Sequence, residues 1–219
     1  MRNWMLLLAI AGVMVGCQQS GPDSSYSTTG EATVTIKEPE PPKDGAASTR
    51  APKDGDKVGV LETGSGRIVF MFFPDVAPKH VARIQEILTK GIWNGTYFHR
   101  VIPGFMIQGG DPNTKDKDRA NDGQGGWGSM LQAEFNSIPH ERGICSMART
   151  QDPNSAQSQI FICHARAASL DNQYTVWGKV VEGRDVVDKI VNLKTENDNP
   201  LDSAKATISK ASLQTWPLK

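Results

Sequence analysis

Short runs of β-branched and aromatic residues, separated by turn-forming segments, constrain the fold of this chain most strongly. The first two runs, 57–63 (KVGVLET) and 66–73 (GRIVFMFF), are separated only by Gly64 and Ser65, and this spacing predicts a β-hairpin. Further strand-like runs lie at 96–112, 143–148, 158–165, 174–181 and 205–213. Many short strands of this kind predict a mainly antiparallel barrel or sandwich, in which closure of the sheet would remove exposed edges.

Two other segments show helical periodicity. Residues 78–90 (PKHVARIQEILTK) begin with Pro78, repeat apolar residues at helical spacing and are followed by Gly91, a residue typical of the position after a helix end. Residues 183–193 (GRDVVDKIVNL) repeat apolar residues at the same spacing. We therefore expect two helices alongside the strands.

The N-terminus has the features of an exported lipoprotein precursor. Arg2 precedes an apolar run at 4–15, which is well short of the roughly 20 residues of a membrane-spanning helix, so a signal peptide over residues 1–16 is favoured over a transmembrane anchor. The run ends in MVGC, which resembles the bacterial lipobox and implies that Cys17 is exposed by cleavage and lipidated. Because Gln18 follows, the resemblance leans to the outer membrane, on the periplasmic side, in a Gram-negative cell envelope. The alternative is an ordinary signal peptide in which Cys17 has no role.

A polar segment separates this leader from the strand-rich region. Residues 17–56 are rich in Ser, Thr, Gly, Pro, Lys and Glu and hold hardly any large apolar side chain, so we expect the lipidated cysteine to be followed by a disordered tether. Residues 57–219 have the length of one ordinary domain. The 24 Lys and Arg residues balance 24 Asp and Glu residues, and no basic block occurs, which argues against nucleic acid as a partner.

Common catalytic signatures are missing from the domain sequence. The four histidines, at positions 80, 99, 140 and 164, stand at unrelated spacings and form no metal-ligand pair, so no metal is expected. The serines lack a nucleophile-elbow pattern, and the glycines of DGQGGWG lack the lysine of a phosphate-binding loop. His99 is interpreted as a structural residue rather than a catalyst.

Arg100 stands among apolar residues in the stretch TYFHRVIPGFMIQGGDP. One interpretation is a surface arginine that pairs with an Asp or Glu, as most such arginines do. The other is a shallow apolar pocket with one fixed cation as its polar element. The pattern alone favours the first interpretation.

Four segments, taken together and in order, identify a family. The segments FHRVIPGFMIQGGDP and SMARTQDPNSAQSQIFIC closely resemble the two signatures of the cyclophilins, which are peptidyl-prolyl isomerases. The segments ETGSGRIVFMFFPDVAPKHVARI and LDNQYTVWGKVVEGRDVVDKI resemble the family's opening segment and the one that follows the second signature. The resemblance extends over residues 58–210, nearly the whole domain.

The resemblance implies a closed eight-stranded antiparallel barrel capped by two α-helices, with the substrate groove on its outer face. Arg100 is similar to the family's catalytic arginine. The implied substrate-binding residues are Phe105, Met106, Phe161 and Leu170 in the proline pocket, Gln108 and Gln159 as polar partners, and Gly123, Ala148, Arg149 and Tyr174 along the groove. The implied partners are proline-containing polypeptides, and no cofactor is needed. We expect a monomer.

Two positions depart from the family pattern. Ser169 stands where many cyclophilins carry a tryptophan at the pocket rim, which puts tight cyclosporin binding in doubt. Tyr174 stands where others have histidine, which we interpret as a conservative change in the groove wall.

The remaining cysteines, Cys145 and Cys163, are predicted to be free and buried. If Ala148 and Phe161 both face the groove, strand alternation places Cys163 on the groove face and Cys145 on the opposite one. A disulfide between them would be sterically awkward.

Two functions of different classes remain open at this stage. The leading one is an exported, lipid-anchored peptidyl-prolyl cis-trans isomerase that assists the folding of envelope or secreted proteins. The alternative is a proline-peptide binding module or chaperone whose isomerase activity is incidental.

Overall fold

The computed structural model describes residues 50–219. The expected signal peptide (1–16), Cys17 and most of the expected tether lie outside the described residues. The end of that tether contacts the domain, since the N–H of Trp216 donates to the carbonyl of Asp56 at 2.8 Å and the N–H of Gly55 donates to the carbonyl of Trp216 at 2.9 Å. Within the described range, no helix is both long enough and apolar enough to cross a membrane.

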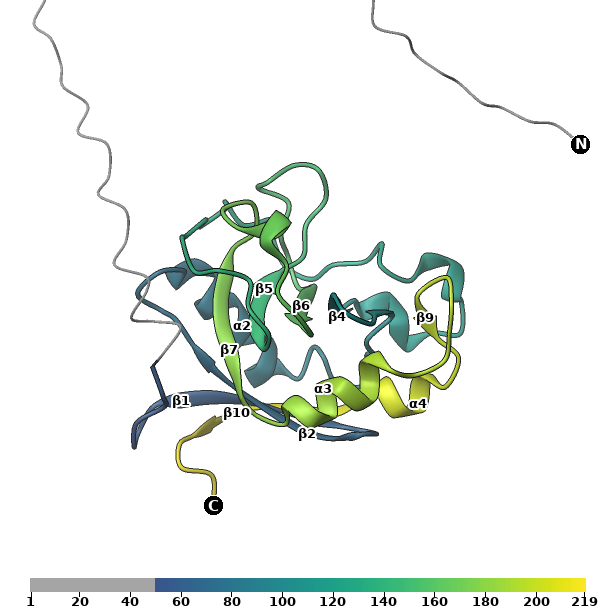
Figure 1. The fold of residues 1–219 in the computed structure, drawn as a ribbon, viewed down its shortest axis with the longest axis horizontal. Coiled ribbons are helices and arrows are strands. Elements are labelled where there is room, and N and C mark those ends of the chain that lie inside the picture. Colours follow the sequence, from purple (N-terminus) through teal and green to yellow (C-terminus); the bar gives the residue numbers. More distant parts are fainter. Residues whose placement is uncertain (1–49) are drawn as a thin grey trace, which may run out of the picture. The chain divides into compact units, whose positions relative to one another are not determined.

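Eight strands form one antiparallel sheet in the order β10-β1-β2-β7-β5-β6-β4-β3. Their bounds are β1 (Lys57–Thr63), β2 (Gly66–Phe72), β3 (Arg100–Ile102), β4 (Met106–Gly109), β5 (Ile144–Met147), β6 (Ile160–Cys163), β7 (Val176–Glu182) and β10 (Ile208–Thr215). Figure 1 shows β7, β5, β6 and β4 following one another across the domain. A separate hairpin consists of β8 (Thr195–Glu196) and β9 (Asn199–Pro200).

The strands confirm the expected pattern of short β-segments. In the first hairpin Thr63 lies opposite Gly66, as the two-residue spacer predicts. The stretch 96–112 contains β3 and β4, and the later strand-like runs contain β5, β6, β7 and β10.

Both expected helices are present. They are α2 (Pro78–Lys90) and α3 (Arg184–Val191). The structure also contains a short helix α4 (Ser203–Ala206) and the 3-10 turns η1 (Pro112–Lys115), η2 (Arg119–Asn121) and η3 (Ala168–Leu170). Helix α2 ends at Gly91, whose φ of 66° is the left-handed conformation that glycine adopts without steric cost. The apolar face of α2 contacts β10 and β7, and that of α3 contacts β2, β3 and β4, so the helices cover different parts of the curled sheet.

Strand alternation separates the core from a second, smaller apolar cluster. In β6, Ile160 and Ile162 point into the main core, which also contains the buried residues of α2 and α3. The alternate residues Phe161 and Cys163 point the other way and cluster with Met106. The same strands therefore build the core with one face and a surface site with the other.

The expectation of a closed barrel is wrong in one respect. The strand order is open, and β3 and β10 are not paired along a ladder in the part of the chain that the structure describes. The gap is bridged by one isolated pair, Tyr97 with Thr207, and the free edge of β3 is occupied by the small hairpin, because Val101 donates its N–H to the carbonyl of Asp198 at 2.8 Å. The hairpin thus bonds to β3 itself, whereas the start of β10 bonds to the segment just before β3, where the N–H of Ile208 donates to the carbonyl of Thr96 and that of Gly95 to the carbonyl of Ile208, each at 2.8 Å.

The prediction for the two domain cysteines is confirmed. Cys145 and Cys163 are free and buried. Cys145 belongs to the main core and Cys163 to the smaller cluster on the opposite face of the sheet. Burial raises the pKa of Cys163 to about 12, and it raises the pKa of Cys145 well above its usual range, so neither thiol is ionised at neutral pH.

Candidate active site

A small apolar pocket of about 120 Å³ lies on the outer face of β3, β4 and β6. The residues that line it are Arg100, Phe105, Met106, Gln108, Ala148, Arg149, Phe161, Leu170 and Tyr174. All of them were expected from the sequence to belong to one site. The structure therefore brings together residues from four separate stretches of the chain.

Strand register explains why these side chains meet. Arg100 in β3 lies opposite Gln108 in β4, and Gln108 lies opposite Phe161 in β6. Directly opposed residues in antiparallel strands present their side chains on the same face. The guanidinium of Arg100, the amide of Gln108 and the ring of Phe161 thus form one row across three strands.

Aromatic contacts fix the floor and one wall of the pocket. The rings of Phe161 and Tyr174 meet edge to face with centroids 5.6 Å apart. The guanidinium of Arg149 lies 4.4 Å from the centroid of Tyr174 and also donates to the carbonyl of Gln173 at 2.9 Å. The Arg149 side chain is therefore held at the rim by stacking and by hydrogen bonds.

A buried histidine supports Phe161 from behind. The ring of His140 stacks on Phe161 with centroids 5.8 Å apart, and its nitrogens lie 3.2 Å from Asp171 Oδ1 and 3.2 Å from Ser146 Oγ. This order of serine, histidine and aspartate is not a nucleophilic triad, because Ser146 is fully buried and its hydroxyl donates to the carbonyl of Thr175 at 2.8 Å.

The ionisation of this group follows from its surroundings. Burial, opposed by the hydrogen bond to Asp171, lowers the pKa of His140. Burial by itself would raise the pKa of Asp171, but hydrogen bonds from Arg166 and from His140 outweigh it and lower that pKa to about 2. Phe161 is therefore supported by a neutral imidazole and a carboxylate that stays ionised.

An amide relay connects the apolar pocket to a second pocket of about 120 Å³. Gln108 donates to Gln159 Oε1 at 2.9 Å, and Gln159 donates in turn to the carbonyls of Gly123 and Gly125 at 2.9 and 2.7 Å. Gly123 and Gln159, both expected site residues, line this second pocket rather than the apolar one. Gly123 has a φ of 83°, and a Cβ there would lie 3.3 Å from His99 Nε2, so a glycine fits this close approach.

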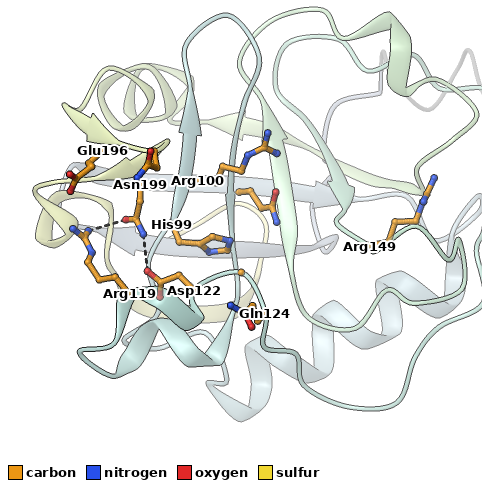
Figure 2. A pocket seen from close by; sticks show the side chains of 11 residues that line it. His99, Arg100, Arg119, Asp122, Gln124, Arg149, Glu196 and Asn199 are labelled. Carbon is orange, nitrogen blue, oxygen red and sulfur yellow. Dashed lines mark hydrogen bonds between the residues drawn. The ribbon is translucent and has the colours of Figure 1, made fainter. Parts of the chain in front are cut away.

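A larger polar groove of about 580 Å³ adjoins Arg100. Figure 2 shows its lining, with Arg149 at one end, a cluster of polar residues at the other, and Arg100 and His99 between them. The cluster joins the loop of η2 to the β8–β9 hairpin, because Asn199 accepts from Arg119 at 2.9 Å and donates to Asp122 at 2.8 Å. The Tyr97 hydroxyl also donates to Asp122.

Sequence reasoning missed this groove. Its walls include Arg119, Asp122, Glu196, Asn197 and Asn199, none of which was expected to lie near Arg100. The only signal for the hairpin wall is the sequence ENDNP, whose Asn and Asp residues favour a tight turn.

His99 is nearly fully buried, with 6% of its surface exposed. Burial lowers its pKa, and the nearby carboxylates of Asp111 and Asp122 oppose that effect only in part. A buried neutral imidazole in the floor is consistent with a structural interpretation of His99.

Comparisons with known proteins show which family the chain resembles. The model of the family described as cyclophilin type peptidyl-prolyl cis-trans isomerase matches residues 58–213. A probable peptidyl-prolyl cis-trans isomerase of Brucella abortus is 44% identical over 173 residues, which are 75% of this chain and 88% of that protein. Peptidyl-prolyl cis-trans isomerase A of Dickeya dadantii is 40% identical over 146 residues, 64% of this chain and 74% of that protein.

A solved structure supports the same assignment. The crystal structure of a cyclophilin type peptidyl-prolyl cis-trans isomerase of Cryptosporidium parvum, obtained in the presence of the dipeptide Ala-Pro, has a TM-score of 0.65 and 27% identity to this chain. The similarity covers 72% of this chain and 99% of that one.

Proposed function

This chain belongs to the family of cyclophilin-type peptidyl-prolyl cis-trans isomerases and catalyses that reaction on proline-containing polypeptides, and we propose that Arg100 is its catalytic residue. The observation that carries the assignment to Arg100 is its position beside an apolar pocket of about 120 Å³, whose other arginine, Arg149, is held against the Tyr174 ring and the carbonyl of Gln173. A pocket of this size and composition suits the ring of one proline.

The chemistry that Arg100 supplies follows from the bond being rotated. Resonance holds an X-Pro amide planar, and rotation has a barrier of about 18 to 20 kcal/mol. In the twisted state the delocalisation is lost, and a lone pair appears on the prolyl nitrogen. A guanidinium that interacts with this nitrogen stabilises the twisted state more than either planar state, which is the requirement for catalysis. An arginine keeps its charge at every working pH.

The other pocket residues hold one side of the bond while the remaining side turns. Phe105, Met106, Phe161 and Leu170 would grip the proline ring. The N–H of Ala148 already donates to the carbonyl of Gln159 at 3.0 Å, so peptide contact falls to the Ala148 methyl group and to the backbone of Arg149. No nucleophile or proton donor is needed for this reaction.

The test is a rate comparison between the wild-type chain and Arg100→Ala. We expect the substitution to lower kcat/KM on a short proline peptide by on the order of 10² to 10³, as removal of one electrostatic stabiliser does. Arg142→Ala is a matched control, because Arg142 is equally exposed (45% against 46%) but pairs with Asp188, away from the pocket. An unchanged rate in Arg100→Ala would refute the assignment.

We further propose that the enzyme is exported and anchored to the cell envelope through lipidated Cys17, on the periplasmic side of the outer membrane, where it assists the folding of envelope or secreted proteins as a monomer. The support is the sequence MVGC after a short apolar run and the polar residues that follow it. Labelling of the full chain with radioactive palmitate in a bacterial host is the measurement. We expect label on the wild type and none on Cys17→Ser, and an unlabelled wild type would contradict the anchor.

One feature favours the second candidate, a proline-peptide binding module or chaperone. The polar groove of about 580 Å³ beside Arg100 offers more contact surface than bond rotation requires. Arg100→Ala distinguishes the two: a chaperone would still protect an aggregating client, whereas an isomerase would lose its effect on proline-limited refolding.

A further inference from the structure

The β8–β9 hairpin places a carboxylate beside Arg100. Its two strands are joined by Asn197 and Asp198, which both have a left-handed backbone, with φ of 51° and 66°. Two successive residues of this kind form the tight turn that matches the twist of a β-hairpin, and Asn and Asp are the residues other than glycine that tolerate it. Asp198 therefore lies at the tip of a turn whose geometry its own sequence favours.

The tip is held in place from two directions. On one side, the carbonyl of Asp198 accepts the N–H of Val101, the residue after Arg100, at 2.8 Å. On the other, the neighbouring Asn199 is bonded to Asp122 and Arg119, as Figure 2 shows. Asp198 is thus fixed relative to the strand that carries Arg100, although its side chain is half exposed.

Apart from Asp198, few groups restrain the side chain of Arg100. Its Nε lies 3.6 Å from Asp198 Oδ2, the one ion pair that Arg100 makes within residues 50–219. Gln108, its cross-strand neighbour, gives its amide N–H to Gln159 instead. The arginine side chain is 46% exposed, and a long side chain at such a position samples many rotamers unless a partner restrains it.

We propose that Asp198 is a positioning residue for Arg100, an inference that rests on the proposed catalytic role of that arginine. The carboxylate engages Nε and leaves the two terminal amino groups of the guanidinium available to the prolyl nitrogen. Restraint of the cation before the bond twists removes an ordering cost from the transition state. The hairpin, a part of the fold with no other described function, then acts on the reaction through the orientation of one side chain.

Two simpler accounts of the Arg100–Asp198 pair predict a different change in rate when the carboxylate is removed. An ordinary surface ion pair contributes little to stability, and its loss would leave the rate unchanged. A carboxylate that merely weakens the positive potential at the pocket would slow the enzyme, so its removal would raise the rate. Of the three accounts, only a positioning role predicts that removal of the carboxylate lowers kcat.

The experiment compares Asp198→Asn with Asp202→Asn in the full chain. Asparagine keeps the shape of the side chain and tolerates the left-handed backbone, so only the charge is removed. Asp202 pairs with Lys205 at 3.5 Å and is 51% exposed, close to the 3.6 Å and 50% of the Asp198 pair, and it lines none of the pockets described above. We expect Asp198→Asn to lose about three- to fivefold in kcat with little change in KM, and Asp202→Asn to match the wild type.

A double-mutant cycle measures the coupling between Asp198 and Arg100, which a purely structural role of Asp198 would not produce. In the Arg100→Ala background, measured at high enzyme concentration, Asp198→Asn should cause no further loss, because the group it orients is gone. An equal loss in both backgrounds, a faster Asp198→Asn enzyme, or a rate equal to that of Asp202→Asn would overturn the proposal. A wild-type rate for Arg100→Ala would instead overturn the catalytic role of Arg100, so the two failures are distinguishable.

Discussion

At the scale of single residues, Arg100 satisfies both interpretations that its sequence context allowed. It pairs with a carboxylate, as a surface arginine usually does, and it also lines the apolar pocket. These two properties are compatible, because Asp198 lies 3.6 Å from Nε and no hydrogen bond within residues 50–219 engages the terminal amino groups. A sequence pattern that indicates an ordinary ion pair therefore does not exclude a catalytic cation.

The residues of the site divide into those that the sequence could identify and those that it could not. Phe105, Met106 and Phe161 lie within continuous motifs, so resemblance to a family identifies them, and strand register then explains their meeting. Asp198 and Asn199 lie far along the chain from Arg100 and follow no motif. Their place at the site depends on the docking of one segment against another, which residue spacing does not report.

At the scale of elements, helix α2 shows where local sequence stops being sufficient. Its bounds agree with the expected 78–90, because Pro78 begins it and Gly91 ends it. Its N-cap, Ala77, makes no side-chain hydrogen bond. The cap comes instead from Glu134, whose carboxylate accepts the N–H of Lys79 at 3.1 Å and that of His80 at 3.0 Å.

We expect Glu134→Ala to lower the free energy of unfolding by about 1 to 3 kcal/mol. The substitution removes the cap of α2 and also leaves the buried His80 ring without the partner that lies 2.6 Å from its Nδ1. Urea unfolding at neutral pH measures the loss. Glu86→Ala is the control, because Glu86 lies on the exposed face of the same helix and pairs, among residues 50–219, only with Arg83 and Lys90. A loss in Glu134→Ala no larger than in Glu86→Ala would contradict the capping role.

The small hairpin and the open barrel are a second case at the scale of elements. β8 and β9 have two residues each, too few for any periodicity to be read from the sequence. This hairpin bonds to the edge of β3, and an isolated bridge links the segment before β3 to the start of β10, where the expected closed barrel would need a continuous ladder. An element too short to predict from periodicity thus lies where the barrel stays open.

At the scale of the whole molecule, the domain combines an apolar core with buried histidines that stay neutral. His80, His99 and His140 are each buried, and burial is the largest cause that lowers the pKa of each. In the unfolded chain these histidines titrate near pH 6.5. Below that pH the unfolded chain binds protons that the folded domain does not, so acid favours unfolding.

We therefore expect the free energy of unfolding to fall as the pH is lowered from 7 to 5. Each histidine that titrates only in the unfolded chain contributes a slope of up to about 1.4 kcal/mol per pH unit. Asp171, with its pKa of about 2, remains ionised throughout this window, and the stability it contributes is lost only at lower pH.

Urea unfolding at pH 7, 6 and 5, on the wild type and on His99→Gln, measures this slope. His99 is the informative position because it is buried without an ion-pair partner in the described part of the chain, so its removal takes away one titrating group and no salt bridge. We expect a shallower slope in His99→Gln, whatever its stability at pH 7. A free energy of unfolding that stays constant or rises as the pH is lowered from 7 to 5 would mean that the buried histidines take up protons in the folded domain. An unchanged slope in His99→Gln would mean that His99 is not one of the histidines that cause the pH dependence.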